Sequence, residues 1–175
     1  MLAANASPIG RSLYAMAMGL TQDLRLHRRC DMQLAELGMA VDSDLDIARR
    51  DVYGLALNLS AWYATYVGQD PLPLREHADQ RLPFIRTDVR GPEREASEMF
   101  HYHVQLSDYG LQALHCNHTM RAPLHVRVAR VKVIWDKLLE WRESLPEALR
   151  WPPRDGVVLH PRYVTYSVLT LTLAV

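Results

Sequence analysis

Apolar residues recur at steps of three and four along four stretches of the chain, which is the spacing of one face of an α-helix. These stretches run from about Ser12 to His27, Leu45 to Val67, Glu93 to Leu114 and Leu124 to Glu143. Three of them carry a well-defined apolar stripe. The stripes are, in order, Leu13, Met16, Ala17, Leu20 and Leu24; Ala48, Val52, Leu55, Leu59, Trp62 and Tyr66; and Leu124, Val128, Val131, Trp135 and Leu138. The pattern therefore predicts four amphipathic helices.

Residues that start or stop helices support these boundaries. Ser43, with Asp46 three residues later, resembles an N-terminal capping pattern before the second helix. Gly68 ends that helix, and four prolines keep residues 68–92 from forming another, so we expect a loop over 68–92. Pro92 suits the first turn of the third helix, where its missing N–H costs nothing. Pro123 separates the third helix from the fourth.

A fifth apolar segment, from about Leu159 to Val175, is rich in Val, Thr and Leu. Local propensity favours a strand there, but a single strand among helices would lack a partner, so we expect a helix. The fold class predicted is all-α, an irregular multi-helix domain. Because the chain stops inside this apolar run, we expect it to be a truncated, incomplete part of a larger helical domain.

Composition narrows the class of protein. The 175 residues suit one domain, 1–175, and 49% apolar with 23% charged residues is typical of a globular chain. Lys and Arg together equal Asp and Glu at 20 each, which argues against a free-standing nucleic-acid binder. The N-terminus is not that of a signal peptide, and no membrane-spanning run is present. Two cysteines provide neither a disulfide framework nor a cysteine zinc site and fit a reducing compartment.

Candidate chemistry is sparse. His101, His103, His115 and His118 lie within 18 residues, and His115 and His118 would share a helix face, so one alternative is a small helical metalloprotein or enzyme using the His101–His118 cluster. Surface or hydrogen-bonded histidines are the simpler interpretation. Cys30 lies beside two arginines, but the sequence shows no base placed to activate its thiol, so it does not indicate catalysis. We expect no catalytic, cofactor-binding or metal-binding residue, and hence no enzyme. The tryptophans are core residues in the simplest interpretation, or they line a pocket for a small effector.

Three stretches together carry a resemblance. AMAMGLTQDLRLHR covers residues 15–28, IARRDVYGLALNLSAWYATYVGQDPLPL covers residues 47–74 and is followed by LPFI at 82–85, and WRESLPEALRW covers residues 141–151. Their order and spacing resemble the middle homology region of fungal binuclear zinc-cluster transcription factors, in the branch of nitrogen-assimilation and xylanolytic regulators. The positions that carry the likeness are Gly19, Leu20, Asp23, Arg49, Arg50, Tyr53, Gly54, Gly68, Pro71, Trp141, Leu145, Pro146 and Trp151.

The resemblance implies a fungal-specific regulatory domain that is non-catalytic, acts in the nucleus and contributes to regulation of DNA-templated transcription. The partners it implies are the parent chain or the transcription machinery, and a small-molecule effector is a further candidate. It implies contact with DNA only through a missing domain, and no contact with a membrane. Zinc belongs to a missing N-terminal six-cysteine cluster, so this fragment needs no cofactor. The loop departs from the family pattern, because Gln69 and Asp70 stand between Gly68 and Pro71 where an arginine is usual. Another alternative is a generic helical scaffold for protein partners.

For the arginine pair, Arg49 and Arg50, a structural role is the simpler interpretation, bridging carboxylates near the start of the helix; contact with DNA is the other. A regulatory domain of this kind would restrain or release an activation segment, which requires two conformational states with different affinities for a ligand.

Overall fold

The computed structural model describes residues 8–29, 36, 38, 43–67, 80–118 and 122–149. Over these ranges the fold is all-α, as the sequence predicts, and the described residues form no strand. The chain divides into two compact units, Met1–Leu114 and His115–Val175, with the boundary inside helix α4. The single domain expected over residues 1–175 stays a prediction.

Helix α1 spans Pro8–Asp23, so it begins and ends four residues earlier than the apolar pattern predicts. Pro8 occupies the first position, where a proline is tolerated because the N–H there has no helical acceptor. The helix ends because Arg25 adopts a left-handed conformation, with φ of 49°. The N–H of Leu26 then donates to the carbonyl of Thr21, and that of Arg25 to Gln22. These two bonds form a Schellman motif, built here without the usual glycine.

Helices α3, Ser43–Val67, and α4, Pro92–His118, confirm the second and third predicted helices. Acidic residues occupy the first turn of each, where they stabilise the positive end of the helix dipole. Helix α4 continues four residues beyond the predicted end, so Gly110 does not stop it. The described part of the preceding loop, 80–91, is non-helical as predicted; residues 68–79, which include Gly68 and Pro71, lie outside the described residues.

In the second unit, helix α5 spans Leu124–Ser144, within one residue of the prediction. It ends where Leu145 turns to an extended conformation, which is the conformation that the following Pro146 imposes on its predecessor. A short 3-10 turn, η1, follows at Glu147–Leu149 and was not predicted. The segment 159–175 that we expect to be helical lies outside the described residues, as does Trp151.

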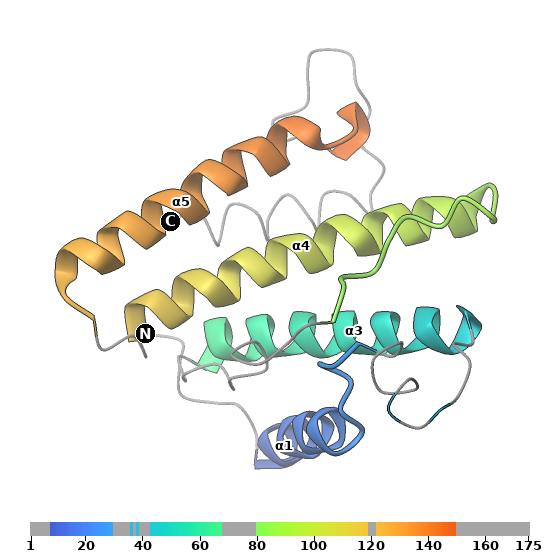
Figure 1. Ribbon diagram of the computed structural model, residues 1–175, viewed down its shortest axis with the longest axis horizontal. Helices are drawn as coiled ribbons and strands as arrows, with labels where there is room; N and C mark the ends of the chain where they lie inside the picture. The colour runs from blue at the N-terminus through green and yellow to red at the C-terminus, as the bar shows by residue number, and fades with distance from the viewer. Residues whose placement is uncertain are drawn as a thin grey trace. The chain divides into compact units, whose positions relative to one another are not determined.

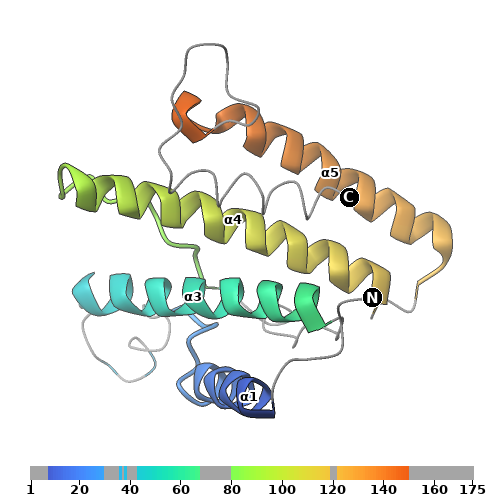
Figure 2. The same ribbon diagram turned by 180° about the vertical axis from the view of Figure 1, so that it is seen from behind.

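The core of the first unit lies where α3 packs between α1 and the first part of α4 (Figures 1 and 2). The buried residues are Tyr14, Met18, Leu26, Tyr53, Ala56, Leu57, Ala61, Val104 and Leu111. The Tyr14 ring stacks on the Tyr63 ring with centroids 3.9 Å apart, and its hydroxyl hydrogen-bonds the buried Ser60 hydroxyl at 3.1 Å. A large aromatic from α1 is thus matched by small residues of α3, which let the two helices approach closely.

The predicted apolar stripes are not the faces that the core uses. Exposed stripe residues are Leu13, Met16 and Leu20 of α1, Leu24 in the turn after it, Val52, Leu55 and Leu59 of α3, and Leu124, Val128, Val131 and Trp135 of α5. The buried line of α1 instead follows Tyr14, Met18 and Thr21. No described helix is both long and apolar enough to cross a membrane.

Candidate functional site

Four of the residues that carry the resemblance, Arg49, Arg50, Tyr53 and Gly54, lie in the first half of α3. Arg49 extends from α3 toward the turn after α1, and its Nη2 donates hydrogen bonds to the carbonyls of Leu24, at 3.1 Å, and Arg25, at 3.0 Å. These carbonyls belong to the Schellman turn, where the negative end of the helix dipole attracts a cation. Arg49 therefore fixes the end of α1 to α3.

Arg50 links α3 to the loop before α4, through Phe84. It forms an ion pair with Asp46 one turn earlier, and its guanidinium lies over the Phe84 ring, 5.5 Å from the ring centroid. Such a stacked arginine gains cation–π attraction while its planar group stays free to pair with a carboxylate. The expectation that the arginine pair bridges carboxylates near the helix start is met by Arg50, whereas Arg49 binds carbonyls.

Gly54 marks the closest approach in this unit. A Cβ built on Gly54 would lie 2.7 Å from Cγ of Pro83, 3.0 Å from Cγ2 of Val104 and 3.1 Å from Cζ of Phe100. Its neighbour Tyr53 is buried in the core. The LPFI stretch is therefore held between α3 and α4 by a contact that only a glycine allows.

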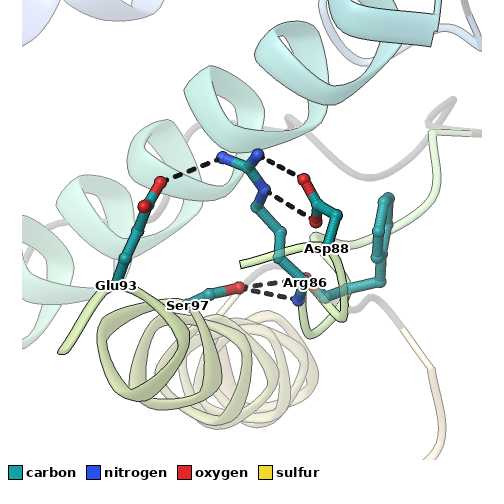
Figure 3. A network of polar contacts seen from close by, with 5 residues as sticks. Arg86, Asp88, Glu93 and Ser97 are labelled. Carbon is teal, nitrogen blue, oxygen red and sulfur yellow. Dashed lines mark hydrogen bonds and ion pairs between the residues drawn. The ribbon is translucent and has the colours of Figure 1, made fainter. Parts of the chain in front are cut away.

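The same loop is tied to α4 by polar contacts. The Pro83 carbonyl lies 2.6 Å from Nδ1 of His101, and the backbone N–H of Arg86 donates to Oγ of Ser97 at 2.9 Å. The Arg86 guanidinium pairs with Asp88 at 2.6 Å and Glu93 at 3.6 Å (Figure 3).

Two carboxyl groups near Arg86 have pKa values shifted in opposite directions, although Arg86 itself lowers both. The hydrogen bond from Arg86 lowers the pKa of Asp88. Burial raises the pKa of Asp51 on α3, although the positive charge of Arg86 partly opposes the rise. The cluster of Asp51, Arg86, Asp88 and Glu93 is a solvent-facing network that orders the loop and favours no particular reaction.

This loop cluster and Ser97 were not among the residues that the sequence singled out, whereas Pro83 lies in the quoted LPFI stretch. The alternation of charge at Arg86 and Asp88, followed by acidic residues in the first turn of α4, is the available signal. It indicates a local ion pair, but it does not indicate which helix the loop contacts.

The remaining motif positions are scattered. Leu20 and Asp23 are exposed, and no described atom lies within 4 Å of a Cβ placed on Gly19, so this glycine does not provide close helix packing. In the second unit Trp141 and Leu145 are buried and Pro146 is partly buried. Within the first unit, Arg49, Arg50, Tyr53 and Gly54 lie on α3 and contact the turn after α1, the loop before α4 and the core, whereas Gly68, Pro71 and Trp151 lie outside the described residues.

The histidines do not converge in the described part of the chain, where no group of three or more His, Cys, Asp or Glu side chains could hold a metal ion. His101 is engaged by the Pro83 carbonyl, Cys116 is buried, and the side chain of His118 lies outside the described residues. Burial lowers the pKa of His103.

His103 should make stability depend on pH. Because its pKa is lower in the folded state, the unfolded chain binds more protons just below the ordinary value of about 6.5, and stability falls as pH falls through that window. One group limits this slope to about 1.4 kcal/mol per pH unit. Urea unfolding between pH 7.5 and 5.5 should show a smaller loss for His103→Gln than for the wild type. His125→Gln, at an exposed position of α5, should keep the loss; equal slopes for all three proteins would contradict the assignment.

Removing the Arg49 guanidinium should loosen the end of α1. We expect Arg49→Ala to lower the free energy of unfolding by about 1 kcal/mol, because two charge-assisted hydrogen bonds near the surface are lost. Arg11→Ala, at an exposed site of α1, serves as the control and should change it by less than about 0.5 kcal/mol. Chemical denaturation measures both, and equal effects would show that the Arg49 contacts contribute nothing specific.

Comparison with protein-family models, with curated proteins and with solved structures gave no match. The likeness to zinc-cluster regulators therefore rests on the quoted residues alone.

Proposed function

We propose that this chain is a non-catalytic regulatory domain of a transcription regulator of the fungal zinc-cluster type, acting in the nucleus. The observation that supports this proposal is that three motif residues of α3 contact the two other motif stretches of the first unit. Arg49 contacts the end of the first motif stretch, and Arg50 and Gly54 contact the LPFI stretch. Motifs separated by about 25 residues or more along the chain thus serve one packing arrangement, as expected if they define a common helical scaffold.

Exposed apolar surface is a second support. Single exposed apolar residues are ordinary, but α1, α3 and α5 each present several in helical register. This is the surface expected of a helical part that packs against further segments of a parent protein or against protein partners. In this proposal DNA and zinc are bound by a separate head, and the domain restrains or releases an activation segment, with or without an effector.

A reporter assay tests the proposal. The full chain is placed between an unrelated DNA-binding domain and an acidic activation domain, and transcription is measured in yeast. We expect about fivefold lower reporter activity than for the fusion without the chain, a coupling typical of regulatory domains. The control carries Leu57→Asp, which places a charge in the core and should abolish the restraint at equal protein level. Equal reporter activity with and without the folded chain would overturn the proposal.

A further inference from the structure

Helix α5 carries an apolar stripe that stays exposed although an adjacent face of the helix is buried. Ile134 and Trp141 are buried, whereas the stripe residues are not. The stripe consists of Leu124, Val128, Val131 and Trp135, which follow one another at steps of four, three and four. These four side chains therefore line one face over about three helical turns.

Cations border this stripe on both sides. Arg127 lies three residues after Leu124 and four before Val131, and Lys132 lies four after Val128 and three before Trp135. Residues at these spacings are neighbours on a helix surface, so the two cations flank the apolar side chains. Between Leu124 and Trp135 the sequence contains no Asp or Glu. The surface thus combines apolar contact area with a net positive charge, with Asp136, four residues after Lys132, as the nearest acidic residue along the helix.

We propose that this α5 stripe docks an acidic amphipathic segment, one in which Asp and Glu alternate with bulky apolar residues. Apolar side chains of the segment lie on Val128 and Trp135, and its carboxylates pair with Arg127 and Lys132, as in helix-in-groove recognition. Acidic–apolar alternation is the composition of amphipathic activation segments. The identification of the docked segment as an activation segment rests on the proposed function, whereas the docking itself does not.

The geometry favours a protein segment over a membrane or a nucleic acid. A helix that lies in a membrane interface sinks a broad apolar face into the lipid, but part of the circumference of α5 is committed to burial through Ile134 and Trp141. The stripe that remains is narrow. Nucleic-acid backbones pair with cations but gain little from an aliphatic stripe, and only Arg127, Arg130 and Lys132 are basic in this stretch.

The test is binding of a fluorescein-labelled peptide to the full chain, measured by fluorescence polarisation. The peptide has about four helical turns and alternates Asp and Glu with Leu and Phe. We expect saturable binding that weakens with salt, because the cations contribute. Val128→Asp should weaken binding at least tenfold, roughly, because it brings a carboxylate to an apolar, acid-binding surface. Val133→Asp is the matched control, since Val133 is 54% exposed against 58% for Val128 but lies off the stripe.

A charge reversal gives a second, independent pair. Lys132→Glu should weaken binding about fivefold, whereas Lys137→Glu, another exposed lysine of α5 away from the stripe, should leave it unchanged. Circular dichroism confirms that all four variants keep their helices. These exposed substitutions do not touch the core, so a loss of binding reports on the surface.

Several outcomes would overturn the proposal. These are absence of peptide binding, equal effects of Val128→Asp and Val133→Asp, or equal binding of a peptide in which lysine replaces the acidic residues. Binding to phosphatidylserine vesicles or duplex DNA but not to the peptide would assign the surface to another ligand. If the peptide binds while the reporter shows no restraint, the proposed function fails and the docking surface stands; the reverse result rejects the surface alone.

Discussion

Leu57→Ala is expected to lower the free energy of unfolding by about 3 kcal/mol. Leu57 is 0% exposed and belongs to the core between α1, α3 and α4. Truncation to alanine removes its transfer free energy and leaves a cavity in a closely packed interior. Urea denaturation followed by circular dichroism measures the change, with the midpoint shifting and the slope unchanged.

Leu55→Ala is the matched control, because Leu55 lies two positions earlier on the same helix and is 57% exposed. The two substitutions make the same chemical change, and both give a slightly better helix former. We expect Leu55→Ala to change stability by less than about 0.5 kcal/mol. If Leu55→Ala costs as much as Leu57→Ala, the predicted stripe with Val52, Leu55 and Leu59 faces the core, and the observed burial is wrong.

The existence and class of the four helices could be predicted from the sequence, because spacing and helix-stopping residues are local properties. Pro92 and Pro123 placed the starts of α4 and α5 to within one residue. The end of α1 could not be predicted, since a non-glycine residue, Arg25, takes the left-handed conformation there. Nothing in an arginine signals such a role.

Which face of a helix is buried was less predictable. Apolar periodicity gives most weight to large aliphatic residues, whereas the buried face of α3 combines Tyr53 and Leu57 with the small residues Ala56, Ser60, Ala61 and Ala64. Such residues bury little area themselves, but they let Tyr14 of α1 approach. A signal was available, because small residues recur at four-residue steps from Ala56 to Ala64. This spacing identifies the packing face of α3 only once the helix that packs against it is known.

For the candidate site, the sequence indicated some of the residues but not their partners. The resemblance drew attention to Arg49, Arg50, Tyr53 and Gly54, each of which contacts another segment of the first unit or its core. It did not indicate their partners, since the acceptors of Arg49 are main-chain carbonyls that leave no trace in side-chain patterns. Contacts between distant segments depend on the tertiary arrangement, which local patterns do not encode.

Two of the motif glycines, Gly19 and Gly54, should respond in opposite directions to the same substitution. Each lies inside a helix, where alanine is favoured over glycine by roughly 1 kcal/mol. At Gly19 no described atom lies within 4 Å of the new methyl group, so Gly19→Ala should stabilise the protein by up to about 1 kcal/mol. At Gly54 the methyl group would lie 2.7 Å from Cγ of Pro83, well inside van der Waals contact.

The clash at Gly54 should outweigh the gain in helix propensity. Pro83 is a buried ring fixed to the backbone, and the Val104 and Phe100 contacts at 3.0 and 3.1 Å close the other directions. Overpacking of this kind costs about 1–3 kcal/mol, so Gly54→Ala should lower the free energy of unfolding by about 1–2 kcal/mol net. Thermal and urea unfolding of both variants and the wild type measure whether each substitution raises or lowers the free energy of unfolding.

A double variant makes the test specific to the loop contact. Pro83→Ala removes the ring atom nearest Gly54, so Gly54→Ala should be less harmful in that background than in the wild type. The interaction between the two substitutions should then be stabilising. If Gly54→Ala stabilises the protein as Gly19→Ala does, the LPFI stretch does not pack against α3. The arrangement that joins the motif stretches, and with it the support for the proposed function, would then be lost.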